Sequence, residues 1–154
     1  MKNKKISASL EDYLETIYEI IQKKHGVKAV EISRHLCVSR SSVTEALKNL
    51  ADKKLVNYGR YDVISLTAEG EKRAKEISLK HHTLYEFLTD VLGIDPEEAQ
   101  ENACRIEHVI SDDVLKKLLA FVDFSKNVNC HNKNYLEKFQ KFYEEVNYED
   151  LKEK

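Results

Sequence analysis

The chain lacks the features that membrane, secreted and fibrous proteins require. Among its 154 residues there are no Trp, one Pro and four Gly, and no apolar run is long enough to span a bilayer. The Lys-rich start, Met1 to Lys5, has no apolar segment of the kind found in signal peptides. Three cysteines at scattered positions form no even disulfide framework. These absences predict a cytoplasmic protein whose reduced thiols are able to bind metal.

Charge, by contrast, is abundant and unevenly distributed. Charged residues make up 34% of the sequence, and the mean hydropathy is −0.56, which indicates a helix-rich protein of one or two small domains. Residues 1–66 hold 12 Lys or Arg and 8 Asp or Glu, whereas residues 67–154 hold 13 and 19. A basic first half suits a surface that faces phosphates, and an acidic second half suits a cation site or an interaction surface. A four-charge excess is also common by chance, so charge alone does not decide the function.

Apolar spacing in the first half of the chain predicts three helices followed by a hairpin. Ser39 has the side chain of an N-cap, and Cys37, in the turn before it, is expected to pack into the core. Two short helices joined by a tight turn are typical of a helix-turn-helix, and the added hairpin makes it a winged helix. The predicted helices span residues 9–24, 30–36 and 39–53, and the predicted strands span 55–58 and 63–66.

The second half of the chain predicts only helices. Thr67 is expected to cap the first of them, and His81 falls on its apolar stripe. Asp95, Pro96 and Glu98 supply the cap, first-turn proline and capping-box acid of the next helix. Ser111 begins another helix, and an amphipathic one ends the chain. The predicted ranges are 68–92, 96–110, 111 to beyond Val122, and 135–146.

One pattern in the second half suggests metal chemistry. Cys104, Glu107 and His108 stand at i, i+3 and i+4 of a predicted helix, which places their Cβ atoms on one face roughly 5–6 Å apart. Thiolate, carboxylate and imidazole at that spacing are able to converge on one cation. The alternatives are that Cys104 is a small buried hydrophobe and that the other two are ordinary helix-surface charges.

The third predicted helix offers polar groups for DNA. In a helix-turn-helix the start of the second helix enters the major groove, where hydroxyl and guanidinium groups reach phosphates or base edges. The candidate DNA-binding residues are Ser39, Arg40, Ser41, Ser42, Thr44, Lys48 and, at the hairpin tip, Arg60. Serines at a helix start also serve simply as caps, so the individual contacts remain open.

Four segments taken together resemble the diphtheria toxin repressor family of metal-dependent regulators. They are residues 10–18, 41–44, 66–70 and 106–108, and they occur in the family's order over about residues 8–124. The chain most resembles the manganese transport regulator branch, which has no SH3-like domain. The resemblance implies a mainly α fold, with an N-terminal winged helix-turn-helix and an all-helical dimerisation domain. The implied boundaries are 1–69 for the DNA-binding domain and 70–124 for metal binding and dimerisation. Residues 125–154 lie beyond the resemblance and are expected to form a C-terminal helical extension.

The resemblance also implies a set of metal ligands. On the pattern of the residues alone, Asp12 and Glu15 belong to a solvated helix face, and His81 is a core histidine. The family pattern makes all three metal ligands, in addition to the three residues of the second half. The implied set is Asp12, Glu15, His81, Cys104, Glu107 and His108.

At Cys104 the chain departs from the manganese branch, which has a Glu there, whereas the iron-responsive branch has a Cys. Asp12 stands where the iron branch has a Met, so the implied site is a hybrid. Thiolate favours Fe²⁺, Co²⁺ or Zn²⁺ over Mn²⁺ by ligand type. The expected cofactor is Mn²⁺ or Fe²⁺, with Co²⁺ or Zn²⁺ able to bind in vitro.

The sequence therefore predicts a homodimeric, metal-activated transcriptional regulator that binds a palindromic operator in double-stranded DNA and represses metal-uptake genes. It predicts no enzymatic activity. Two alternatives remain, namely a winged-helix regulator that metal does not control and a small metalloenzyme. Cys130 and His131 are adjacent without a further partner and are assigned to a surface loop.

Overall fold

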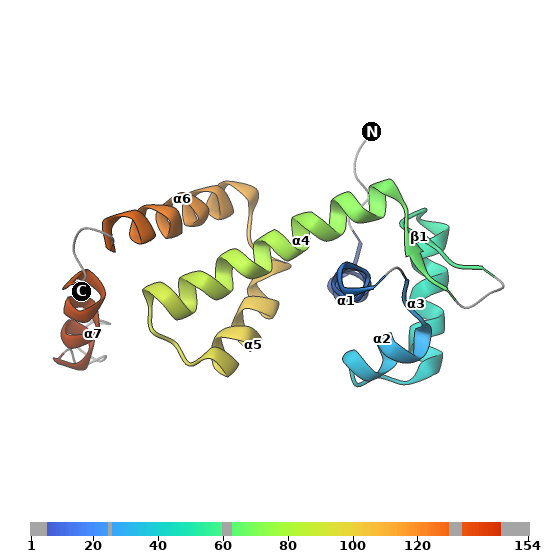
Figure 1. Cartoon of the computed structure of the whole chain (residues 1–154), viewed down its shortest axis with the longest axis horizontal. Helices are drawn as coiled ribbons and strands as arrows, with labels where there is room; N and C mark the ends of the chain where they lie inside the picture. Colours follow the sequence, from blue (N-terminus) through green and yellow to red (C-terminus); the bar gives the residue numbers. More distant parts are fainter. Residues whose placement is uncertain (1–5, 25, 60–62, 130–133, 146–154) are drawn as a thin grey trace. The chain divides into compact units, whose positions relative to one another are not determined.

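The computed structural model describes residues 6–24, 26–59, 63–129 and 134–145, and the chain divides into two compact units, Met1–Leu79 and Lys80–Lys154 (Figure 1). The order of helices around a short antiparallel hairpin confirms the expected mainly α fold. No helix in these ranges is long and apolar enough to cross a membrane. The elements are α1 (Ala8–Lys23), α2 (Ala29–His35), α3 (Arg40–Asp52), β1 (Val56–Asn57), β2 (Ser65–Leu66), α4 (Ala68–Glu86), the π-helix η1 (Phe87–Val91), α5 (Pro96–Glu107), α6 (Asp112–Asn129) and α7 (Asn134–Glu145).

The first unit is organised around α1, α2 and α3, each of which turns one apolar face inward. Burying one large aliphatic side chain contributes roughly 1.5–3 kcal/mol, so these faces fix how the three helices pack together. The opposite face of α3 is left exposed. The completely buried side chains of the three helices include Leu14, Ile17, Ile32, Leu47 and Leu50.

The turn between α2 and α3 departs from expectation at Cys37. This residue is exposed, with a left-handed φ of 54°, and its Sγ lies 3.7 Å from the carbonyl oxygen of Arg34. Its neighbours Leu36 and Val38 pack against the core instead, so the residue between them faces outward. The expectation that Cys37 packs into the core is therefore wrong.

The wing, which is the hairpin formed by β1 and β2, has shorter strands than predicted, and Val27 outside the hairpin also pairs with it. Val56 pairs with Leu66 and Asn57 with Ser65 in an antiparallel register. Ile64 does not continue this ladder: its N–H donates to the carbonyl of Val27 at 2.8 Å, and it accepts from the Val27 N–H at 3.3 Å. The segment between α1 and α2 thus helps to hold the wing in the first unit.

The second unit contains the end of α4, the π-helical turn, and α5 to α7. The predicted helix over 68–92 is α-helical only to Glu86, and in the last turn the Leu92 N–H donates to the Phe87 carbonyl at 3.1 Å. Asp95 caps α5 as expected, since its Oδ1 accepts from the Glu97 N–H at 2.9 Å. The helix ends at Glu107 and not near residue 110, and His108 is its C-cap.

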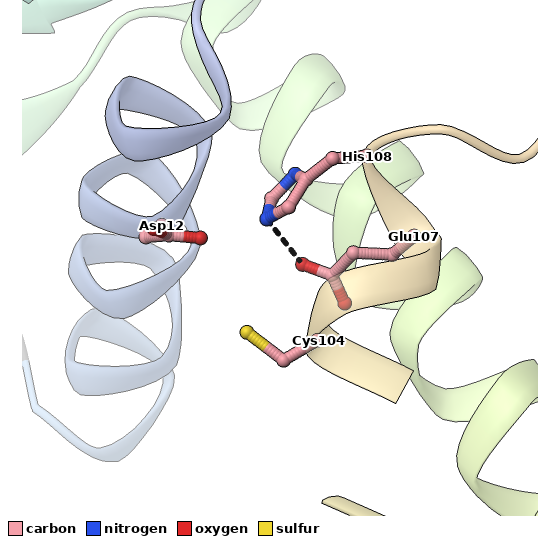
Figure 2. Close-up of side chains that lie close together, drawn as sticks. All are labelled: Asp12, Cys104, Glu107 and His108. Atoms are coloured by element: carbon pink, nitrogen blue, oxygen red, sulfur yellow. Dashed lines mark ion pairs between the residues drawn. The ribbon is translucent and has the colours of Figure 1, made fainter. Parts of the chain in front are cut away.

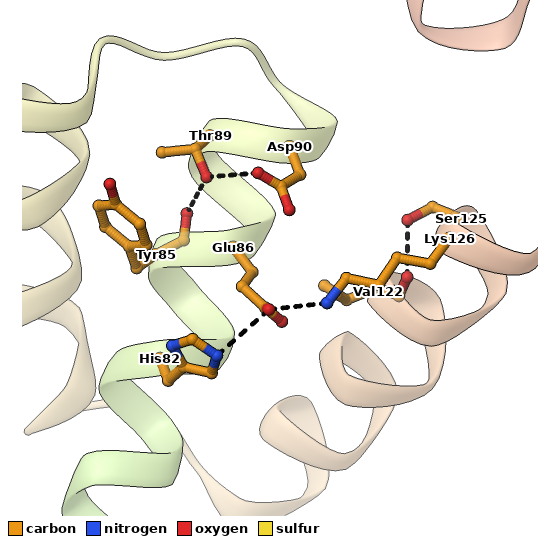
Figure 3. Close-up of polar contacts among 8 residues, drawn as sticks. All are labelled: His82, Tyr85, Glu86, Thr89, Asp90, Val122, Ser125 and Lys126. Carbon is orange, nitrogen blue, oxygen red and sulfur yellow. Dashed lines mark hydrogen bonds and ion pairs between the residues drawn. The ribbon is translucent and has the colours of Figure 1, made fainter. Parts of the chain in front are cut away.

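A polar contact ties α6 to α4 within this unit (Figure 3). Glu86 accepts from Lys126 Nζ at 2.7 Å and lies 3.2 Å from the Nε2 of the exposed His82. The hydrogen bond to Glu86 is the main reason that the pKa of Lys126 is raised. Buried apolar residues, including Leu84, Leu115 and Val122, form the core beside this contact.

Candidate metal centre and nucleic-acid interface

Three of the predicted metal ligands come together at the C-terminal end of α5 (Figure 2). Cys104 and Glu107 lie in the last turn, and His108, the C-cap, keeps near-helical dihedral angles of −77° and −19°. The i, i+3, i+4 spacing therefore survives past the end of the helix. One ligand atom from each of the three residues lies within 4.8 Å of the others. This distance suits donors that share one cation after small side-chain adjustments.

Glu107 is the most constrained member of the group. Its side chain is 0% exposed. Oε2 lies 2.6 Å from Nδ1 of His81, which is a short contact of the charge-assisted kind. Oε1 forms an ion pair with His108 when that imidazole is protonated (Figure 2), but the 3.6 Å separation from Nε2 is too long for a hydrogen bond, and Oε1 has no hydrogen-bond partner in the described part of the chain. A buried carboxylate oxygen left in this state is costly, and a cation beside it would remove the cost.

The two neighbouring histidines of α4 differ sharply in environment. The His81 side chain is 16% exposed and reaches Glu107, whereas the His82 side chain is 69% exposed. Adjacent residues of an α-helix point about 100° apart, which accounts for the difference. The structure thus brings His81 to the same carboxylate that lies beside Cys104 and His108.

The remaining two predicted ligands, Asp12 and Glu15, lie one turn apart on α1 in the first unit. Both are half-buried. Between and beside them are the buried side chains of Tyr13 and Leu14, which anchor α1 in the core. Burial raises the pKa of Tyr13, and the nearby negative charges of Asp12 and Glu45 raise it further. The carboxylates of α1 are therefore carried on a helix that is firmly packed into the first unit.

The candidate DNA-binding residues cluster at the start of α3. Ser39 is the N-cap, with Oγ accepting from the Ser42 N–H at 3.1 Å, and its hydroxyl lies 2.8 Å from the hydroxyls of both Ser41 and Ser42. Thr44 Oγ1 donates to the carbonyl of Arg40 at 2.9 Å. The side chains of Arg40 and Lys48 are exposed on this helix, and Arg60 lies outside the described residues, as do Cys130 and His131.

One exposed group on α3, Glu45, is not among the DNA-binding residues expected from the sequence. It stands between Thr44 and the buried Ala46, in the second turn of the helix. The signal was present in the sequence, because the apolar residues of α3 already define which positions face away from the core. A search for DNA contacts that favours basic and hydroxyl side chains passes over a carboxylate.

Two family profiles match this chain in sequence order. Residues 5–63 match "Iron dependent repressor, N-terminal DNA binding domain". Residues 67–136 match "Iron dependent repressor, metal binding and dimerisation domain". The first match contains α1 to α3, and the second contains His81 and the donors of α5.

Similar proteins include transcriptional regulators from archaea and bacteria. An uncharacterised HTH-type transcriptional regulator of Methanocaldococcus jannaschii is 40% identical over 123 residues, which are 79% of this chain and 98% of that protein. The HTH-type transcriptional regulator MntR of Bacillus subtilis is 30% identical over 139 residues, covering 90% of this chain and 96% of MntR.

Solved structures with a similar fold include metal-dependent transcriptional regulators. The manganese regulator SloR has a TM-score of 0.67 at 29% identity, over 75% of this chain and 54% of SloR. The regulator IdeR of T. acidophilum has a TM-score of 0.65 at 27% identity, over 76% of this chain and 54% of IdeR. The chain thus spans about half the length of these solved relatives. The chain belongs to the iron-dependent repressor family of metal-dependent transcriptional regulators, which is the diphtheria toxin repressor family expected from its sequence.

Proposed function

We propose that this protein is a homodimeric repressor that binds a palindromic operator when it holds Fe²⁺ or Mn²⁺, and that it controls metal-uptake genes from the cytoplasm without catalysing a reaction. The observation that carries the metal-dependent part is the buried Oε1 of Glu107, which has no hydrogen-bond partner in the described part of the chain and lies among thiol and imidazole donors. The names of the similar proteins, which include manganese regulators, support the same role.

The proposed ligands are Asp12, Glu15, His81, Cys104, Glu107 and His108. A bound divalent cation would supply the positive charge that the buried Glu107 carboxylate lacks. Cys104 would hold it through a thiolate, which suits Fe²⁺ better than Mn²⁺, whereas the carboxylates suit both ions. His81 positions Glu107 through the 2.6 Å contact between Nδ1 and Oε2.

The proposed switch acts through α1. Tyr13, Leu14 and Ile17 fix this helix against α2 and α3, so a constraint on α1 is passed to the recognition helix. We propose that Asp12 and Glu15 impose the constraint when they join the ligands of the other unit. For a useful switch, metal has to bind the DNA-competent state more tightly by a few kcal/mol, on the order of 1–3.

On the DNA side, we propose that α3 enters a major groove with Arg40 and Lys48 near phosphates or base edges. The candidate contacts at its start are Ser39, Ser41, Ser42 and Thr44, and Arg60 of the wing is a further candidate. A two-fold dimer presents two such helices to successive grooves, which is why a palindrome is expected. We propose that residues 1–69 form the DNA-binding domain, residues 70–124 the metal-binding and dimerisation domain, and residues 125–154 a C-terminal helical extension.

DNA binding measured with and without metal tests this function. Promoter fragments are titrated with the full chain in anaerobic buffer with Fe²⁺, Mn²⁺, Co²⁺, Zn²⁺ or a chelator. His108→Ala should abolish the stimulation by metal while circular dichroism shows an unchanged helical content. His82→Ala is the matched control, since that imidazole is exposed and lies outside the donor group. Equal affinity with metal and with chelator in the unmutated protein would favour a regulator that metal does not control.

A further inference from the structure

The second turn of α3 presents a carboxylate where the helix faces furthest from the core. Val43, Ala46, Leu47 and Leu50 are buried and define the inward face. With about 100° between successive residues, the positions opposite that face are those of Ser41, Glu45, Lys48 and Asp52. All four are exposed. This line of side chains is the one that a groove-bound α3 would turn toward the bases.

Several other polar groups on this helix are already engaged. The Ser39 hydroxyl lies within hydrogen-bond distance of the hydroxyls of both Ser41 and Ser42, and the Thr44 hydroxyl donates to the backbone. The Glu45 carboxylate, in contrast, makes neither a hydrogen bond nor an ion pair with any residue in the described ranges, although its charge acts on the hydroxyl of Tyr13 in α1. Its acceptor oxygens are therefore available to a ligand.

A carboxylate facing DNA can gain only from a narrow set of partners. Phosphates repel it, so it contributes nothing to sequence-independent affinity. It accepts hydrogen bonds and does not donate them, and the major-groove edges of guanine and thymine offer only acceptors and a methyl group. Adenine offers an amino group beside the N7 acceptor, whereas cytosine offers its N4 amino group with no neighbouring acceptor on the same base. Cytosine is thus the base that suits Glu45 best.

We propose that Glu45 is a specificity-determining residue that selects a cytosine in each half of the operator through the N4 amino group. Lys48, one turn further along the same exposed line, supplies a positive charge that offsets the carboxylate as it approaches the phosphates. This inference rests on the proposed binding of α3 in a major groove. It goes beyond the proposed function by naming one base of the operator, because the basic and hydroxyl side chains of α3 can contact several bases or phosphates and so do not identify one.

Selection from a random duplex library tests the proposal. The full chain, loaded separately with Mn²⁺ and Fe²⁺, is compared with Glu45→Ala, Glu45→Gln and Asp52→Asn. The last is a matched control, because it removes one negative charge from the same exposed line but lies at the far end of α3. The readout is base preference at each position, followed by the affinity for single-base variants of the selected duplex.

The expected result is one cytosine position per half-site, at which a change to thymine weakens binding by the unmutated protein roughly tenfold. Glu45→Ala should bind both duplexes within about twofold of each other, and Glu45→Gln should shift the preference toward adenine, whose N6 and N7 suit an amide. Asp52→Asn should keep the cytosine. Unchanged preferences in both Glu45 variants would overturn this inference alone, whereas no sequence-selected duplex with either metal would overturn the proposed function as well.

Discussion

Replacement of Glu107 by Gln distinguishes a metal ligand from a carboxylate that merely supports the fold. In the metal-free protein two contributions oppose each other. Oε1, which has no hydrogen-bond partner in the described part of the chain, costs about 1–3 kcal/mol, while the 2.6 Å contact of Oε2 with His81 contributes about 1.5–3 kcal/mol. Since these terms nearly cancel, the free energy of unfolding of the metal-free variant should differ by less than about 1 kcal/mol from that of the unmutated protein.

With metal, the melting temperatures of the unmutated protein and of Glu107→Gln should differ. A ligand present at about 1,000 times its dissociation constant stabilises the folded state by about 4 kcal/mol. For a chain of this size each kcal/mol raises the melting temperature by about 2–4 °C, so saturating metal should raise it by roughly 8–16 °C. Glu107→Gln should lose most of that rise, because a neutral amide replaces the buried carboxylate that the cation needs.

The assay is thermal unfolding followed by circular dichroism, with Mn²⁺, Co²⁺ or a chelator. Glu101→Gln is the matched control: it makes the same chemical change on α5, where Glu101 is exposed and lies 3.8 Å from Arg105. It should melt like the unmutated protein in all three conditions. A Glu107→Gln variant that keeps the full metal-induced rise, or one that loses several kcal/mol without metal, would show that Glu107 is structural.

Two further pairs of substitutions, each with a matched control, test the thiolate ligand and the packing at Gly70. Cys104→Ser should remove the sulfur-to-metal charge-transfer band of the Co²⁺ complex in the near ultraviolet, whereas Cys37→Ser should retain it; a band that depends on Cys37 would place the thiolate ligand elsewhere. Gly70→Ala should lower the free energy of unfolding by about 3 kcal/mol, measured by urea titration, since a Cβ there would lie 1.8 Å from the carbonyl oxygen of Leu55. Gly59→Ala should be nearly neutral, because a Cβ there would meet no side chain or backbone of the described residues within 4 Å beyond its chain neighbours; equal losses at both glycines would refute the steric explanation.

The starts of α3, α4 and α5 could be predicted because the signal is local. Ser39 caps α3, Thr67 accepts from the Gly70 N–H at 3.0 Å, and Asp95 caps α5, all as expected from side chains within a few residues of the helix start. The spacing of Cys104, Glu107 and His108 on one face is local in the same sense. These features depend on neighbours in the sequence and so are legible there.

Features that depend on distant partners could not be predicted. The pairing of Val27 with Ile64 joins segments 37 positions apart, and no pattern near Val27 indicates a strand. The complete burial of Glu107 depends on how α5 packs in its unit, and from the sequence it could equally have been a surface charge. The roles of the six proposed ligands and of the DNA-facing side chains stay predictions until variants are measured.

The arrangement of α1 has a consequence for how this protein can change over generations. Core residues and proposed ligands alternate along it, with Tyr13 and Leu14 buried between Asp12 and Glu15. One inserted residue before Asp12 would rotate the rest of the helix by about 100° and carry that carboxylate into the place of Tyr13. Such an insertion would disrupt the winged helix together with its response to metal. Point substitutions in α1 can therefore change or remove the response to metal while the fold is kept. An insertion or deletion in this helix would damage the fold and the metal response together, so selection should act against it.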